Sequence, residues 1–368
     1  MTTIINAPLS VASGVDLLGN DYPNLFVHTR GDKLDLAAPI CANEHMGAVI
    51  CVSPKITRAN LANVVARFVH AGANPTGLML DANRYSGKAR SVGADGMNTA
   101  WVRAQTNAGI PHPLTNSGYI PDGNHDALRS VLRTSADMGE QVIAALPIAN
   151  SFLQRDVGVL IEEINAAGVS VALMIEHRKD PFGPRANVAG LLKVLDAARV
   201  PVLLLRSDLS VLGALAWGAR AGAFGTSTTL RHIYPVTKSG GGRPASISAI
   251  VKDSMSLNRL EKIDDAIQRM PDPMWNCPCT ICFGRSLNWI ATEDEAFQHS
   301  LSVVADLSTQ VLDNNLSPLQ RRRLWRSLCH NAQFRAHEID AATAGAWGEP
   351  PDYLGAWVAQ HIDEHATI

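Results

Sequence analysis

The sequence lacks the features that define several common classes of protein. No apolar run among its 368 residues is long enough to cross a bilayer and no signal peptide opens it, so we expect a cytoplasmic protein with no membrane partner. Neither G-x-G-x-x-G nor G-x-x-x-x-G-K followed by Ser or Thr occurs, which leaves both familiar nucleotide-binding loops without support. The formal net charge is only −2, which argues against a strongly electrostatic nucleic-acid binder but is compatible with a local basic patch. What the chain does have is 46% hydrophobic residues, enough for a sizeable core.

Cysteine is scarce and unevenly placed, with four of the six residues between Cys277 and Cys329. Cys277, Cys279 and Cys282 lie within six residues and follow a turn-forming Pro-Asp-Pro segment at 271–273. Three thiolates at this spacing suit a tetrahedral Zn²⁺, which needs one further ligand. A disulfide within so short a loop is geometrically poor, and the prolines argue against three ordinary buried cysteines. We therefore predict a structural zinc ion whose four positions are all filled by the protein.

The fourth zinc ligand has three candidates, namely His330, Cys329 and His299. His330 opens an amphipathic segment at 330–339, and a histidine at the start of a helix commonly completes a site of this kind. His299 lies within an earlier helical stretch, where histidines are more often on the surface, and Cys329 directly precedes His330. The pattern favours His330.

Short apolar runs alternate with segments of helical period through most of the chain. The expected strands are at 34–41, 48–52, 77–80, 113–119, 141–148, 169–175, 200–205 and 221–224, and the expected helices between them are near 57–72, 96–108, 124–137, 154–167, 186–198 and 208–220. Short buried strands alternating with helices predict a parallel sheet, and eight of them fit a (β/α)₈ TIM barrel, with an open doubly wound sheet as the alternative.

This pattern divides the chain into three parts. We predict an irregular N-terminal arm over 1–33, the α/β barrel over 34–255, and an appended helical, zinc-binding module over 256–368, with a flexible glycine-rich loop at 238–243. Five arginines of the last part, at 321, 322, 323, 326 and 335, form either a solvated helix face or a surface that contacts phosphate.

Function in such a barrel collects at the carboxyl ends of the strands. Asp81 and Glu176 end two of the expected strands and are the candidate catalytic carboxylates, able to divide nucleophile and acid/base roles. The candidate substrate-binding residues at the same edge are Asn83, Arg84, Asn150, His177, Arg206, Thr226 and Ser227. Simpler interpretations are a helix cap for Asn150, a rim position for His177, and an ion pair of Arg84 with Asp81.

A barrel with an appended C-x-C-x-x-C site resembles the tRNA-guanine transglycosylase family. The loop Cys277–Cys282 and the pair at 330–331 are similar to that family's zinc ligands, with a longer gap between them here. Residues 78–81 resemble the strand whose aspartate contacts the exchanging base, which Asp81 matches. The family's last strand supplies a nucleophilic aspartate, and residues 221–226 carry none.

The resemblance implies base exchange or N-glycosidic chemistry on a nucleic acid or nucleoside. Asp81 would then read the base, and Glu176 would be the substitute nucleophile. Two other hypotheses remain open: a non-catalytic accessory or nucleic-acid-binding member of the superfamily, and a barrel enzyme acting on an unrelated small molecule with purely structural zinc. The expected partners are a nucleobase, nucleoside or nucleic acid, and a second subunit in a homo- or heterodimer.

Overall fold

The computed structural model describes residues 18–19, 21–52, 58–236 and 246–362. Most of the predicted arm and the predicted glycine-rich loop at 238–243 lie outside these ranges. The described core is a seven-stranded, wholly parallel sheet in the order β3-β2-β1-β7-β6-β5-β4. The strands are β1 (Leu25–Arg30), β2 (Gly47–Cys51), β3 (Leu78–Asp81), β4 (Ile143–Ala149), β5 (Ser170–Glu176), β6 (Val202–Ser207) and β7 (Ala221–Gly225).

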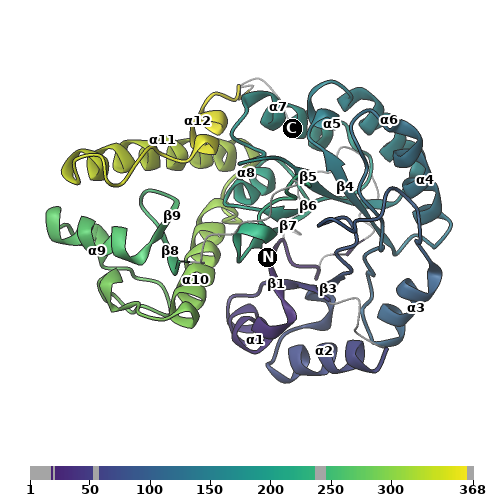
Figure 1. Cartoon of the computed structure of the whole chain (residues 1–368), viewed down its shortest axis with the longest axis horizontal. Coiled ribbons are helices and arrows are strands. Elements are labelled where there is room, and N and C mark those ends of the chain that lie inside the picture. The colour runs from purple at the N-terminus through teal and green to yellow at the C-terminus, as the bar shows by residue number, and fades with distance from the viewer. Residues whose placement is uncertain (1–17, 20, 53–57, 237–245, 363–368) are drawn as a thin grey trace, which may run out of the picture.

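The sheet is curled as in a barrel (Figure 1), and its first and last parallel strands, β1 and β7, are paired with each other in the middle of the order. The regular sheet has its edges at β3 and β4. Residues 113–119, predicted as a strand, and the following Ile120 run beside β4. They meet it only in isolated bridges, Leu114 with Ile143 and Ile120 with Ile148. The α/β class is confirmed, and the regular sheet is a seven-stranded half-barrel rather than the complete eight-stranded barrel that we predicted.

Side chains interrupt the ladder between β4 and this extended segment. The hydroxyl of Thr115 accepts from the Ala145 N–H at 2.9 Å, and the hydroxyl of Ser117 donates to the Ala145 carbonyl at 2.5 Å. Pro147, in the same strand, has no N–H to donate. Some hydrogen bonds that two regular strands would form between their backbones are therefore made here by side chains of residues 115 and 117, or are missing at Pro147.

Helices cover the outside of the curled sheet (Figure 1). They are α1 (Leu34–Asn43), α2 (Arg58–His70), α3 (Thr99–Asn107), α4 (His125–Ala136), α5 (Ser151–Gln154), α6 (Val157–Ala167), α7 (Arg185–Ala197) and α8 (Ser210–Ala216). The prediction of a strand over 34–41 was wrong, since these residues belong to α1. Leu34, Ala37, Ala38 and Cys41 are buried at helical spacing. The first strand, β1, lies instead within the predicted arm.

The C-terminal part is an antiparallel hairpin with four helices. The hairpin consists of β8 (Ser248–Val251) and β9 (Ser256–Arg259), and the helices are α9 (Leu260–Arg269), α10 (Glu293–Val311), α11 (Pro318–Ala342) and α12 (Asp352–Val358). Capping boxes start α10 at Thr292 and α11 at Ser317. The predicted boundary at 255/256 therefore falls inside the hairpin, and the helix expected to begin near 330 is the middle of α11.

Helix α8 joins the two parts, because it packs on β6 and β7 of the sheet and on α10 and α11 of the C-terminal part. Every one of its residues is buried. A Cβ atom on Gly213 would lie 2.5 Å from Trp325 of α11 and 2.6 Å from Trp357 of α12, so glycine allows these helices to approach α8 closely.

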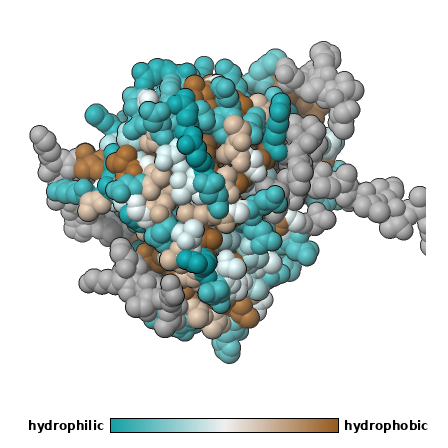
Figure 2. Space-filling view, turned by 90° about the vertical axis from the view of Figure 1, so that its right-hand side faces the viewer, coloured by the Kyte–Doolittle hydropathy of each residue, from teal (hydrophilic) through white to brown (hydrophobic). Residues whose placement is uncertain are grey.

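The side of the molecule opposite to α11, over α3, α4 and α6, is largely hydrophilic with scattered hydrophobic residues (Figure 2). Within the described ranges, no helix has both the length and the apolar character needed to span a membrane.

Candidate functional site

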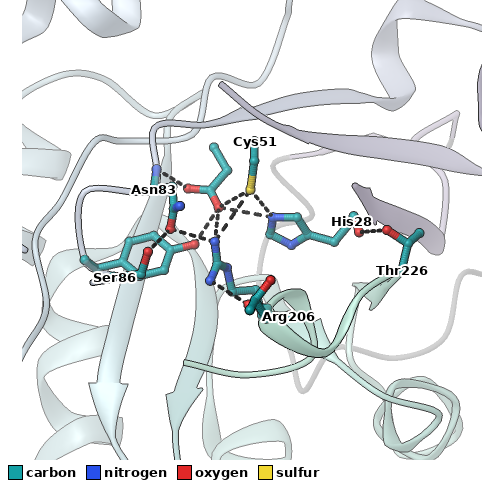
Figure 3. Close-up of polar contacts among 9 residues, drawn as sticks. His28, Cys51, Asn83, Ser86, Arg206 and Thr226 are labelled. Atoms are coloured by element: carbon teal, nitrogen blue, oxygen red, sulfur yellow. Dashed lines mark hydrogen bonds and ion pairs between the residues drawn. The ribbon is translucent and has the colours of Figure 1, made fainter. Parts of the chain in front are cut away.

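Four polar side chains from different strands meet at the carboxyl edge of the half-barrel. His28 lies on β1, Cys51 ends β2, Asp81 ends β3, and Arg206 lies near the end of β6. Cys51 Sγ is 3.4 Å from His28 Nε2 and 3.5 Å from Asp81 Oδ2, and His28 Nε2 is 3.1 Å from the same oxygen. Figure 3 shows Cys51, His28 and Arg206 converging on one point. We call these four residues the floor cluster.

Asp81 is the centre of the floor cluster. Besides the contact with His28, its carboxylate accepts hydrogen bonds from the N–H of Asn83 at 2.7 Å and the hydroxyl of Tyr85 at 2.5 Å. Arg206 Nη2 lies 3.5 Å from Asp81 Oδ2, and both side chains are only 2% exposed. Burial alone would raise the pKa of Asp81, but the hydrogen bond from His28 and the charge of Arg206 outweigh it and hold this pKa well below its usual range. Asp81 is therefore ionised.

Arg206 combines a strained backbone with an incompletely satisfied side chain. The backbone φ is 50° at Arg206 and 49° at Asn83, so both residues are in the left-handed region. This conformation costs a non-glycine residue about 1 kcal/mol or more, and such residues cluster at functional sites. The guanidinium donates to Asn83 Oδ1 at 2.6 Å and to the Thr229 carbonyl at 3.2 Å. Its buried Nε has no hydrogen-bond partner among the described residues. A buried donor without an acceptor is costly, so this arginine is a candidate for binding an external acceptor.

The other two members of the floor cluster are held in their neutral forms. Burial lowers the pKa of His28, and burial together with the charge of Asp81 raises the pKa of Cys51. At neutral pH the thiol is therefore protonated unless a cation replaces its proton. His28 Nδ1 is buried and has no partner within the described part of the chain.

A cavity of about 880 Å³ opens at the floor cluster. Its lining comes from the segments after β1, β2, β3 and β7 together with Arg206, and comprises residues 30–32, 51–52, 82–83, 86–88, 206, 229–230 and 234–236. Cys51, Asn83 and Arg206 reach this cavity from the floor cluster and its surroundings. Among the described residues, the charged lining residues are Arg30, Lys88 and Arg206 against Asp32 alone, so this part of the lining has a cationic surplus. Its size is in the range of small-molecule sites.

Glu176, the second predicted catalytic carboxylate, belongs to a separate cluster. It accepts from the Tyr119 hydroxyl and from Arg90 Nη1, each at 2.5 Å, and the Arg90 guanidinium carbon lies 3.7 Å from the centre of the Tyr119 ring. It is not among the described residues that line the cavity, and within them no hydrogen bond or ion pair links it to Asp81. Asp81 and Glu176 are therefore paired with different arginines, Arg206 and Arg90, and not with each other.

The predicted substrate-binding residues separate into two groups. Asn83 and Arg206 line the cavity. Arg84 is not among the described lining residues, and it donates to the Gly96 carbonyl and Ser91 Oγ rather than forming the alternative ion pair with Asp81. The partner of Asp81 is Arg206.

The other four predicted substrate-binding residues do not line the cavity as described. Thr226 donates to Thr29 Oγ1 at 3.1 Å, and the Ser227 hydroxyl lies 3.2 Å from that of Thr229. His177 Nδ1 accepts from the Lys179 N–H at 3.2 Å. Asn150 precedes α5 without a side-chain capping bond.

A second polar site lies in the C-terminal part. Cys277, Cys279, Cys282 and His299 are all buried, and their ligand atoms lie within 4.8 Å of one another. His299 Nδ1 is 3.1 Å from Cys282 Sγ and 3.7 Å from Cys279 Sγ. These four residues could hold a metal ion. The choice of His330 as fourth ligand was wrong, because His330 is exposed on α11, and Cys329, although buried, is outside this group.

The surroundings of this Cys₃His site fit metal ligation. His299 Nε2 lies 2.8 Å from the Ile250 carbonyl of β8, which can only accept, so this nitrogen carries the proton and Nδ1 presents its lone pair to the sulfurs. Trp289 Nε1 donates to Cys282 Sγ at 3.2 Å, and the Cys282 N–H donates to Cys279 Sγ at 3.4 Å. Hydrogen-bond donors that point at the sulfur atoms suit thiolates, which carry negative charge.

Sequence reasoning missed His28 and Cys51. Both end or lie on strands at the same edge as Asp81, but His28 fell in the predicted arm. Cys51 is the penultimate residue of the run 48–52, which was correctly predicted as a strand. Its position at the end of a strand could have identified it as a candidate.

Half-barrel and floor cluster together define an α/β protein with a cavity at the carboxyl edge of a parallel sheet. No protein-family model matches the sequence, and no curated protein matches it. Two solved structures are similar at 14% identity. One is an HpcH/HpaI aldolase/citrate lyase family protein from Burkholderia cenocepacia J2315, with a TM-score of 0.37 over 57% of this chain and 90% of that chain. The other is a dipeptide epimerase from Methylococcus capsulatus complexed with Mg ion, with a TM-score of 0.34 over 57% of each chain.

These comparisons correct the resemblance to tRNA-guanine transglycosylases. Neither structure belongs to that family, and no model of it matches the chain. The resemblance depended mainly on three closely spaced cysteines. A short cysteine loop can complete a metal site on many folds, so its spacing predicts a kind of ligation and not a family.

Proposed function

We propose that the protein is an enzyme that binds a small molecule bearing a carboxylate or phosphate in the cavity at the floor cluster. The observation that carries this proposal is the buried guanidinium of Arg206 in the cavity lining, with an Nε that finds no partner among the described residues. Arginine donates in a fixed fork that matches carboxylate and phosphate oxygens. The position agrees, since active sites of barrel-like sheets lie at the carboxyl edge.

Other features of the cavity support an anionic ligand. Lys88 adds positive charge to the lining, where Arg30 is paired with Asp32, the one acidic residue among those described. Asn83 and Thr229 hold the guanidinium in place, so little side-chain freedom is lost when a ligand binds. Leu230, Pro235 and Val236 offer apolar surface to the body of the ligand.

The test is a thermal-shift and calorimetric screen of small carboxylates and phosphates against three proteins. The wild type should bind at least one of them. Arg206→Lys keeps the charge but loses the fork and should weaken binding at least tenfold. Arg129→Lys, a matched change on the exposed face of α4, should bind like the wild type. No binding by the wild type, or equal binding by Arg206→Lys, would refute the proposal.

We also propose that Cys277, Cys279, Cys282 and His299 hold a structural Zn²⁺. Four protein ligands leave no position for water or substrate, so this ion would stabilise the cysteine loop against α10 and β8. Zinc measured in purified His299→Ala and His330→Ala decides the assignment. Loss of one equivalent only in His299→Ala is expected, and loss only in His330→Ala would contradict it.

A further inference from the structure

We propose that His28, Cys51 and Asp81 form a second metal site, which binds a divalent ion such as Zn²⁺ and keeps one coordination position open to the cavity. The ligand atoms of these three residues form a group of the kind that could hold an ion. The site deepens the proposed function, because the ion would face the ligand that Arg206 binds. Its existence is tested by metal content, which does not depend on that ligand.

The distances among the three ligand atoms agree with one face of a tetrahedron around zinc. Typical bonds of zinc to nitrogen, oxygen and sulfur give ligand-to-ligand separations of about 3.4 Å for N and O and about 3.6 Å for S with either. The corresponding distances are 3.1 Å from His28 to Asp81, 3.4 Å from Cys51 to His28, and 3.5 Å from Cys51 to Asp81. An ion can therefore be placed among them with only small movements.

The number and burial of the ligands point to a site of the catalytic type. Catalytic zinc sites have three protein ligands and one exchangeable position, whereas structural sites have four protein ligands. Cys51 lines the cavity, while His28 and Asp81 are almost completely buried behind it. The fourth position would therefore be on the cavity side. All three residues stand on paired strands, β1, β2 and β3, so their spacing is rigid.

The histidine can adopt the tautomer that a metal needs. Without an ion, the ionised Asp81 carboxylate accepts the Nε2 proton, and His28 Nδ1 has no partner among the described residues. Binding of an ion at Nε2 therefore moves the proton to Nδ1, where no described neighbour opposes it. With the proton on Nδ1, the lone pair of Nε2 is directed at Asp81 and Cys51. The Cys51 proton leaves to solvent when the ion binds, as metal–thiolate bonding requires.

Arg206 is compatible with an ion at this place. Its Nη2 lies 3.5 Å from Asp81 Oδ2, the long limit of an N–H···O hydrogen bond, and 3.5 Å from Cys51 Sγ, whereas its bond to Asn83 Oδ1 is 2.6 Å. Ionised Asp81 and a Cys51 thiolate together carry two negative charges, which a divalent ion neutralises. The charge of Arg206 is then free for the anionic ligand, so the ion and the guanidinium would hold it from two sides.

The experiment measures zinc by mass spectrometry after equilibration of the full-length protein with excess Zn²⁺ and gel filtration. We expect two equivalents in the wild type, one in Cys51→Ala and one in Cys277→Ala. Cys41→Ala, which removes a buried cysteine from α1, should keep two. Circular dichroism checks the fold, and Cys51→Ala leaves the contact between Asp81 and Arg206 in place. One equivalent in the wild type, or two in Cys51→Ala, would overturn the second site.

Cobalt gives a second readout. In the Co²⁺ protein, the absorption that disappears in Cys51→Ala should change when the anion from the screen is added, and the absorption that disappears in Cys277→Ala should not. Zinc at one equivalent with normal anion binding would refute the second site and leave the proposed function standing. Two equivalents of zinc without anion binding would refute the proposed function and leave the second metal site standing.

Discussion

Asp81 stabilises the fold by neutralising the buried Arg206 and accepting three hydrogen bonds. Asp81→Asn would leave that guanidinium buried without a counter-charge, and we expect a loss of about 3–5 kcal/mol in the free energy of unfolding. Asp35→Asn, which breaks the exposed pair with Arg67, should cost less than about 1 kcal/mol. Urea denaturation of the two variants measures both values, and equal effects would show that the contacts of Asp81 are not energetically special.

At the scale of residues, Asp81 could be predicted because a carboxylate that ends an apolar strand must be paired or used. His299 could not be selected, since its burial depends on how α10 packs against the cysteine loop and β8. His330 looked suitable because a helix was expected to begin at it. In the structure α11 continues through it and turns it to solvent.

Among the elements, α8 depends most on its neighbours, and Gly213 is the position that shows it. Gly213→Ala would place a methyl group against Trp325 and Trp357, and should destabilise the protein by about 1–3 kcal/mol. Gly158→Ala, on α6 where a Cβ atom meets nothing within 4 Å, should stabilise it by about 0.5–1 kcal/mol. Thermal denaturation compares the two, and a stabilising Gly213→Ala would contradict the packing of α11 and α12 on α8.

Elements with a clear period were predictable, and those decided by packing were not. Runs such as 169–175 and 200–205 are apolar except for Ser170 and became β5 and β6. The run 34–41 is apolar except for Asp35 but is helical, because a short apolar run fits a helix as well as a strand. The predicted strand at 113–119 keeps its extended course, but Thr115 and Ser117 replace part of its backbone pairing.

For the whole molecule, stability should depend on pH through Asp180. This residue shares a cavity of about 250 Å³ with Asp208, Asp352 and Arg231, at the junction of the half-barrel with α12. Burial and the charge of Asp208 raise the pKa of Asp180 to about 8. Between the ordinary aspartate pKa and about 8 the folded state holds a proton that the unfolded state lacks, so this group's contribution to stability is lost as pH rises towards 8.

The clearest window for this effect is pH 6.5 to 8. Below it, His28 and His232, whose pKa values burial lowers, add stability as pH rises and oppose the effect. Urea denaturation across the window should show unfolding free energy falling by up to about 1.4 kcal/mol per pH unit. Asp180→Asn should flatten this slope, and Asp126→Asn, on an exposed part of α4, should not. An unchanged slope in Asp180→Asn would assign the effect to other groups.

The class of the whole fold was accessible from alternation of strand and helix, but closure of the sheet was not. Closure depends on whether the segment before β4 pairs regularly, which a few polar side chains decide. The location of the cavity followed from the rule that parallel strands end at one edge. The predicted nucleic-acid partner and the predicted dimer stay predictions.

A crystal structure with the tightest-binding anion of the screen tests the central claim most directly. We predict electron density for its carboxylate or phosphate within hydrogen-bond distance of the Arg206 guanidinium, inside the cavity at the floor cluster. Density for the anion on the arginines of α11, with none beside Arg206, would contradict the account.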